Sequence, residues 1–116
     1  MLATNIASGA EAQFDRVLRA LAHPARRALV ERLQRGSAPV GALAQALGMS
    51  LPSASKHLKA LEAAGLVSRA ITGRTHRCAL NPAPLRAVAG WLAAYRGFWE
   101  DQLAALARHL DDGVDE

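Results

Sequence analysis

The chain of 116 residues has one cysteine, Cys78, and no long apolar segment. A single cysteine cannot form a disulfide within the chain, which favours a reducing compartment. No apolar run approaches the roughly 20 residues that span a bilayer. The first nine residues also lack the basic start and long apolar core of a secretory signal. We therefore expect a soluble, cytoplasmic protein.

Motifs that carry enzymatic chemistry are missing as well. There is no glycine-rich phosphate loop, no nucleophile motif and no pair of carboxylates in a plausible cleft, so we do not expect an enzyme or a bound cofactor. The hydrophobic fraction of 51% suffices to build a core without disulfides or metal. The length is that of one domain, which we expect to span residues 11–110 between a flexible arm (1–10) and an acidic tail (111–116).

Acidic residues are scarce in the middle of the chain. The formal charge is +3 for residues 1–49, +4 for residues 50–80 and −3 for residues 81–116. A basic segment confined to one region indicates a local anionic partner, such as nucleic acid, rather than general solubilisation.

The basic segment begins with a predicted helix, residues 50–64, that has two different faces. At 100° per residue an apolar stripe forms from Leu51, Ala54, Leu58 and Leu61. The opposite face has no acid and carries Pro52, Ser53, Lys56 and Lys59, with Ser55 and His57 at its sides. Ser50 can cap this helix and Pro52 suits its first turn.

Apolar periodicity predicts the other helices. They cover residues 11–22, residues 24–36 after the break at His23-Pro24, and residues 40–47. Only Gly48 and Met49 separate this last helix from the basic one. Two short helices joined by a tight turn, the second with a basic face, are typical of a helix-turn-helix.

The sequence pattern of residues 66–80 predicts a β-hairpin with a basic tip, because two stretches typical of strands flank the turn residues 72–75. A single long helix is then expected over residues 85–110, with apolar residues at spacings of three and four. Four of the five aromatic residues lie in it.

The sequence resembles the ArsR/SmtB-type bacterial transcriptional repressors. The resemblance rests on segments 21–27 and 73–74 and on the run Ser-Lys-His-Leu-Lys-x-Leu-x-x-x-Gly-Leu-Val at residues 55–67. It implies a mainly α winged helix-turn-helix with five helices and a two-stranded wing. It also implies a homodimer, formed through the first and last helices, that binds a palindromic operator with helix 50–64 in the major groove and wing 66–80 on the adjacent backbone or minor groove. Many relatives have glutamine where this chain has Leu51.

On this interpretation, Lys56, Lys59, Arg74 and Arg77 contact phosphates, whereas Pro52, Ser53, Ser55 and Lys56 are candidates for the groove. Arg69 is expected to point outward from its strand near the DNA. His57 and His76 either contact DNA or have local roles. Ser50 and Thr75 complete the predicted DNA-binding set.

The predicted dimer interface combines the apolar positions of the first and last helices. Its residues are Phe14, Val17, Leu18, Leu21, Trp91, Tyr95, Phe98, Trp99, Leu103 and Leu106. A chain of this size has few places to bury so many aromatic side chains, so we expect a second subunit to cover them.

Members of the resembled family sense metals through two kinds of site, and this chain lacks most of the ligand residues of both. Residues 39–42 lack the paired cysteines of a thiolate sensor, and His109 and Asp112 match only half of a last-helix metal site, because Phe98 and Arg96 occupy the other half. No metal site is expected. Cys78 has no resolving partner and is more typical of a buried apolar residue than of a redox sensor.

Two alternatives to a DNA-binding repressor remain open. One is a small protein-interaction module that docks a partner through the aromatic last helix, its basic helix being a solvated face. The other is a metal-responsive variant of the repressor.

Overall fold

The structure is a computed structural model that describes residues 9–114, with side chains to residue 111. The chain forms two compact units, divided between Leu85 and Arg86. Within residues 9–114, every helix is too short or too polar to cross a membrane.

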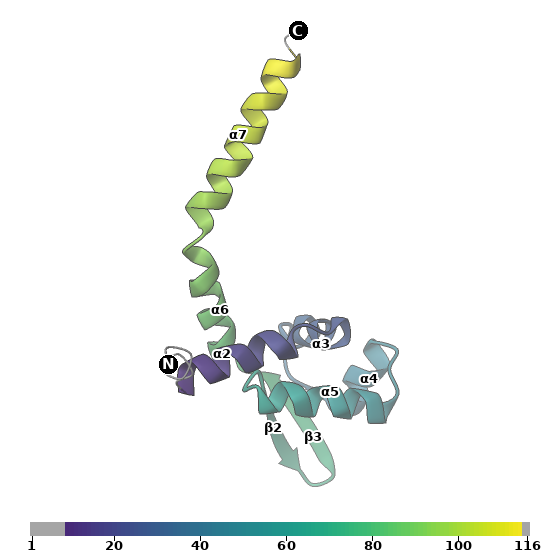
Figure 1. Cartoon of the computed structure of the whole chain (residues 1–116). Helices are drawn as coiled ribbons and strands as arrows, with labels where there is room; N and C mark the ends of the chain where they lie inside the picture. Colours follow the sequence, from purple (N-terminus) through teal and green to yellow (C-terminus); the bar gives the residue numbers. More distant parts are fainter. Residues whose placement is uncertain (1–8, 115–116) are drawn as a thin grey trace. The chain divides into compact units, whose positions relative to one another are not determined.

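Over residues 9–85, the first unit contains four complete helices and a small sheet, and Figure 1 labels the helices and the two longer strands. In chain order its elements are α2 (Gly9–Ala20), α3 (Pro24–Leu33), β1 (Ala38–Pro39), α4 (Val40–Ala46), α5 (Leu51–Ala63), β2 (Val67–Thr72) and β3 (Thr75–Leu80). The order of these elements is that of a winged helix-turn-helix, as the sequence predicts. Helix α2 begins at Gly9, so the last two residues of the expected arm are helical, and residues 1–8 lie outside the described part.

The sheet has three antiparallel strands in the order β1-β3-β2, one more than the predicted two-stranded wing. The additional strand, β1, is only two residues long and pairs Ala38 with Cys78 and Pro39 with Arg77. Pro39 has no N–H to donate, which restricts it to a sheet edge. A two-residue strand containing proline leaves no periodicity in a sequence, so the sequence pattern does not predict it.

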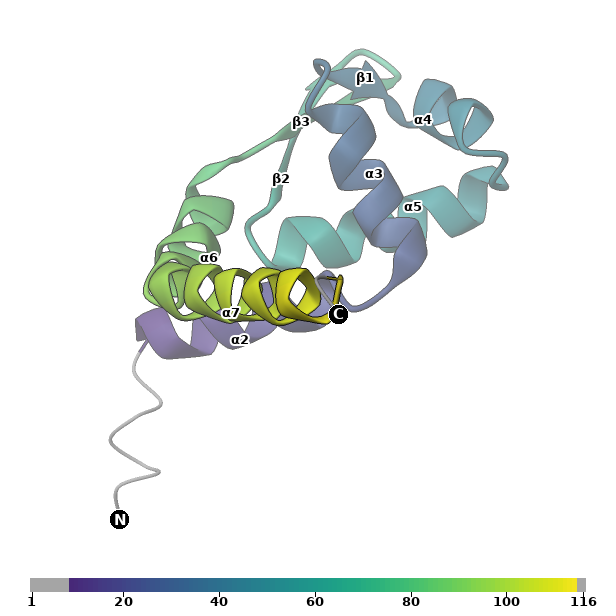
Figure 2. The ribbon, with the colours of Figure 1, turned by 90° about the horizontal axis from the view of Figure 1, so that it is seen from above.

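The core of the first unit lies where α5 packs on α2, α3, α4 and β2, and where α3 and α4 pack on β3; Figure 2 shows these elements from above. Its largest fully buried side chains are Val17, Leu29, Leu43, Leu58, Leu61, Leu66 and Cys78. Among the described residues no polar or charged residue is buried. The helical face of α5 with Leu58 and Leu61 is thus fixed inward, which directs the opposite face to solvent.

The predicted single helix over residues 85–110 is wrong in its continuity. The structure has α6 (Ala83–Ala93) and α7 (Arg96–Val114) in its place, so the described part of the chain contains six helices instead of five. At the break, the N–H groups of Ala94 and Tyr95 bond to carbonyls three residues back, those of Trp91 and Leu92. This tighter turn interrupts the α-helical ladder. Helix α7 also continues to Val114, through most of the expected tail.

Candidate nucleic-acid interface

The turn between α4 and α5 places the basic helix. Helix α4 ends at Ala46, Gly48 follows it with a φ of +64°, and the N–H of Met49 bonds to the carbonyl of Ala44 at 2.9 Å. This is a Schellman ending, in which a left-handed glycine lets the chain reverse direction. Two residues later Ser50 Oγ accepts a hydrogen bond from the Ser53 N–H at 3.2 Å and caps α5.

Helix α5 separates core and solvent residues along its length. Ala54, Leu58 and Leu61 are fully buried, whereas the side chains of Lys56 and Lys59 are exposed. The predicted acid-free cationic face is therefore in contact with solvent. Leu51 departs from the prediction: it is 56% exposed and does not join the core stripe, because it lies in the first turn, beyond the packed part of the helix.

His57 joins α5 to α3. Its Nδ1 accepts a hydrogen bond from Arg26 Nε at 3.2 Å, so Nδ1 carries no proton. Burial lowers the pKa of His57 from its ordinary value, and the charges of Arg26, His23 and Lys56 lower it further. His57 therefore has a local role, which is to link the basic helix α5 to α3 through its hydrogen bond with Arg26.

The wing is the hairpin of β2 and β3, whose two-residue turn, Gly73-Arg74, puts Arg74 at the tip. Figure 1 shows the hairpin projecting beyond the helices of its unit. Asn81 closes its base: the backbone N–H of Asn81 bonds to the carbonyl of Leu66 at 2.8 Å, and its side-chain Nδ2 bonds to the carbonyl of Gly65 at 2.9 Å. The wing is thereby fixed to the end of α5.

Arg69 does not point outward, contrary to the prediction. Its side chain is 13% exposed, and its Nε lies 3.3 Å from Oε2 of Glu62 on α5. Its Nη1 lies 3.4 Å from Nδ1 of His76 on the neighbouring strand. Apolar and polar residues alternate imperfectly in the hairpin sequence, so the inward position of Arg69 could not be predicted from it. The carboxylate of Glu62 compensates the charge of Arg69.

Other predicted wing residues are exposed, and one of them is tethered. Thr75, His76 and Arg77 are exposed. Arg77 Nη1 donates to both the carbonyl oxygen (2.9 Å) and Oγ (3.0 Å) of Ser37. This contact links β3 to the segment before β1, so Arg77 has a structural partner in addition to its proposed phosphate.

The predicted dimer residues fall into two groups. On α6 and α7 the predicted residues are all exposed: Trp91, Tyr95, Phe98, Trp99, Leu103 and Leu106. Leu92 and Leu110, which are outside the predicted set, are exposed as well. Some of these rings touch within the chain, with centroids 5.2 Å apart for Trp91–Tyr95 and for Phe98–Trp99. On α2, Leu18 is exposed and Phe14 and Leu21 are half-buried, but Val17 is 1% exposed and belongs to the chain's own core. Val17 is therefore removed from the interface set.

Cys78 is fully buried between β1 and β2, where its Cα pairs with those of Ala38 and Arg69. Burial raises the pKa of its thiol, an effect that nearby Arg69 opposes and Glu62 adds to.

Over the part of the chain that the structure describes, no group of three His, Cys, Asp or Glu side chains is placed to hold a metal ion.

Several residues that organise this surface are not predicted from the sequence. Arg26, Ser37, Glu62 and Asn81 act as partners of His57, Arg77, Arg69 and the wing base. Each acts through a contact between residues that are 7 to 40 positions apart. Short-range patterns carry no signal for such pairs.

Comparison with known proteins gives consistent matches. Residues 21–70 match a family model described as a helix-turn-helix domain. The chain is 39% identical over 102 residues to the HTH-type transcriptional regulator Rv2034 of Mycobacterium tuberculosis, covering 88% of this chain and 92% of that protein. Among solved structures, the ArsR family transcriptional regulator RHA00566 is 42% identical with a TM-score of 0.68, over 76% of this chain and 97% of its own. The homodimeric winged helix-turn-helix DNA-binding domain Mb0332 of Mycobacterium bovis is 32% identical with a TM-score of 0.61, over 72% and 81%.

The fold and these matches define a winged helix-turn-helix transcriptional regulator. More narrowly, because the relatives exceed 30% identity over most of their length, the chain belongs to the ArsR family of such regulators.

Proposed function

We propose that this protein is a dimeric, sequence-specific DNA-binding repressor that acts on an operator in the cytoplasm. The observation that carries the proposal is the exposed face of α5 with Lys56 and Lys59, which lies next to a basic wing. The acid of this helix, Glu62, lies beyond both lysines and is paired with Arg69. Such a face attracts the phosphate backbone, and a helix of this kind fits the major groove.

The proposed docking gives the exposed residues different tasks. Lys56, Lys59 and Arg74 contact phosphates and supply affinity, with Arg77 and Thr75 beside them on the wing. Pro52, Ser53 and Ser55 face the groove from the first turns of α5. Ser50 caps the helix at the same end. Leu51, exposed there, offers apolar surface that suits a thymine methyl group and cannot form the paired hydrogen bonds that glutamine makes with adenine.

Two copies of the chain would place two α5 helices on one palindromic site. The exposed apolar side chains of α6 and α7 support this assembly, because monomeric proteins rarely leave contiguous apolar surface uncovered. Phe14, Leu18 and Leu21 of α2 are the further candidates for the interface.

The test is a mobility-shift titration with the DNA that flanks the protein's own gene. The double substitution Lys56→Ala/Lys59→Ala should weaken binding and lower the slope of log affinity against log salt by about 1 for each phosphate that is no longer neutralised. Both lysines are exposed, so the fold should be retained.

The matched control removes two charges elsewhere. Arg32→Ala/Arg35→Ala, at the end of α3, has the same change in net charge and should leave the salt slope unaltered. Equal DNA binding by the wild-type protein and the lysine variant would refute the proposed interface.

A second candidate, a protein-interaction module, is favoured by the exposed aromatic side chains of Trp91, Tyr95, Phe98 and Trp99. It predicts a monomer that binds DNA weakly and without sequence preference. Light scattering together with a titration of competitor DNA separates the two candidates, because only the repressor is both dimeric and resistant to non-specific competitor.

A further inference from the structure

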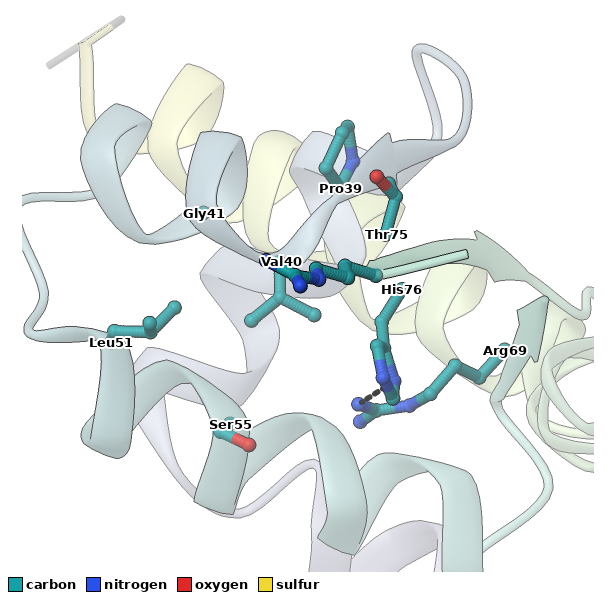
Figure 3. Close-up of a pocket in the computed structure, with 9 residues that line it drawn as sticks. Pro39, Val40, Gly41, Leu51, Ser55, Arg69, Thr75 and His76 are labelled. Carbon is teal, nitrogen blue, oxygen red and sulfur yellow. Dashed lines mark hydrogen bonds between the residues drawn. The ribbon is translucent and has the colours of Figure 1, made fainter. Parts of the chain in front are cut away.

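A hollow of ≈ 410 Å³ lies in the first unit between the start of α4, the first turns of α5 and the wing. Figure 3 shows its lining residues coming from all three elements. The volume lies in the range that holds small organic ligands. Its position is between the two elements to which we assign DNA contact, so an occupant would lie within the proposed interface.

One part of the lining is apolar. Pro39 contributes from the end of β1, Val40 from the start of α4 and Leu51 from the start of α5. Leu51 is largely exposed at this position instead of packing in the core. An apolar group in the hollow would remove part of this surface from water, which stabilises the bound state.

The other part of the lining is cationic. Arg69, Arg74 and His76 contribute from the wing, and none of the described lining residues is acidic. Figure 3 shows the guanidinium of Arg69 beside the ring of His76, on the side facing α5. An anionic group would therefore meet Arg74 and Arg69, the second of which already shares its charge with Glu62 outside the lining.

Arg69 has an unused donor. Its Nε is engaged by Glu62 and its Nη1 lies within reach of His76 Nδ1, but its Nη2 is buried and has no hydrogen-bond partner among the described residues. A buried donor without an acceptor destabilises a structure. Nη2 has almost no accessible surface, so an anion in the hollow reaches it when the guanidinium of Arg69 turns toward the anion, and the hydrogen bond then formed satisfies the donor.

We propose that this hollow binds a small organic carboxylate, with the carboxylate at Arg69 and Arg74 and the apolar body against Pro39, Val40 and Leu51. A backbone phosphate of DNA would satisfy the arginines but has no apolar part for the remaining lining. Resting on the proposed DNA-binding function, the occupied hollow lowers operator affinity, because the ligand lies between α5 and the wing. Operator DNA must then lower ligand affinity by the same factor.

The binding test uses the full-length ¹⁵N-labelled protein and four probes followed by NMR. Octanoate has both chemical features, octan-1-ol lacks the charge, acetate lacks the apolar body, and inorganic phosphate stands for the DNA backbone. We expect saturable shifts for octanoate at Val40, Leu51 and residues 69–76, with affinity at least about tenfold above that for octanol and acetate. Equal binding of octanol, saturable shifts confined to the amides of α7, or tighter binding of inorganic phosphate would each overturn the proposal.

Variants move the affinity in opposite directions. Arg74→Gln, at the exposed tip, and Arg69→Gln should each weaken octanoate binding, whereas Glu62→Gln should strengthen it several-fold, because it removes the carboxylate that neutralises Arg69. Arg32→Gln, on α3 and outside the lining, is the matched control and should have no effect. Unchanged octanoate affinity in both Arg74→Gln and Glu62→Gln would refute the assignment of the anion site.

The effect on DNA is measured separately, so that the two proposals can fail independently. Octanoate, but not acetate, should raise the protein concentration needed for half-maximal shift of the operator. Because NMR binding requires no DNA, a protein that binds octanoate but no DNA would refute only the proposed function. Undiminished operator affinity at saturating octanoate would refute the competition.

Discussion

His57 lies between the cationic face of α5 and the face that packs on the rest of the domain. It lies among the cationic residues, yet its Nδ1 accepts from Arg26 of α3 and its environment is partly buried. A protonated ring could not accept this hydrogen bond and would face the charges of Arg26 and Lys56. The neutral form is thus part of the folded structure.

The first prediction concerns pH. The pKa of His57 is lowered in the folded state from an ordinary value of 6.5, so below that value the unfolded chain binds more protons. Stability should therefore fall as pH is lowered from about 7.5 to about 5.5. His57→Gln, whose amide oxygen can still accept from Arg26, should show a weaker pH dependence in urea unfolding.

The control for this effect is His109→Gln, which changes an exposed histidine on α7. It should retain the full pH dependence of the wild-type protein. If His57→Gln retained it as well, the linkage of His57 to folding would be wrong.

The second prediction concerns Cys78. A fully buried thiol with a raised pKa forms little thiolate, so its reaction with a disulfide reagent in the native protein should be slow, at least about tenfold slower than in urea. Absorbance of the released thiolate follows the reaction. Ser68→Cys in a Cys78→Ala background places a thiol on the exposed side of β2 and should react at once in the native state. Rapid native labelling of Cys78 would instead make it accessible to oxidants.

At the scale of elements, the end of α5 determines where the wing starts. Leu66 N–H bonds to the carbonyl of Leu61 and Gly65 N–H to that of Glu62, both at 2.9 Å. This is the second Schellman ending in the chain, and both leucines are fully buried beside it. Gly65 adopts a φ of +83°, which side chains with a Cβ rarely allow.

The third prediction follows from this backbone conformation. Gly65→Ala should lower the free energy of unfolding by about 1–2 kcal/mol, because a left-handed conformation is strained for alanine. Its Cβ would also come within 2.8 Å of Gln13 Nε2, the movable end of a side chain. Gly41→Ala in α4 meets no atom within 4 Å and should raise stability by roughly 0.5–1 kcal/mol. Equal effects of the two substitutions in urea titrations would contradict this account.

Elements with a regular pattern are predictable from sequence, and those defined by single hydrogen bonds are not. The helices α2 to α5 and the hairpin follow apolar periodicity and the Gly48 and Gly65 signals. The break between α6 and α7 depends on two backbone hydrogen bonds, which leave the apolar spacing of the sequence unchanged. The inward turn of Arg69 depends on Glu62, a contact between a helix and a strand. Charge and motif therefore locate the candidate interface, whereas its internal partners require the structure.

At the scale of the whole molecule, most of the buried core and the exposed aromatic residues of the described chain occupy different parts of it. The buried apolar residues of the described chain extend from Val17 to Pro84, whereas the exposed aromatic side chains lie in residues 91–99. The first unit thus has a core of its own. The second has an apolar surface that, under the proposed function, is covered by another copy.

The fourth prediction tests this assembly. Phe98→Ser/Trp99→Ser should convert a dimer to a monomer in light scattering and weaken operator binding on the order of a hundredfold, since the two half-sites would then be bound independently. Circular dichroism should stay unchanged, because both side chains are exposed within the chain.

The paired control is Glu100→Ala/Asp101→Ala, which alters exposed polar residues of the same helix. It should remain dimeric. A monomeric wild-type protein at concentrations that saturate the operator would contradict the dimer.

The exposed aromatic residues of α7 also bear on how the cell would use such a protein. When subunits pair only weakly at low abundance, the amount of paired protein follows the square of the subunit concentration. A halving of synthesis would then leave about a quarter of the paired form. The rate at which the gene is translated, or the protein degraded, would itself become an input to the regulated promoter.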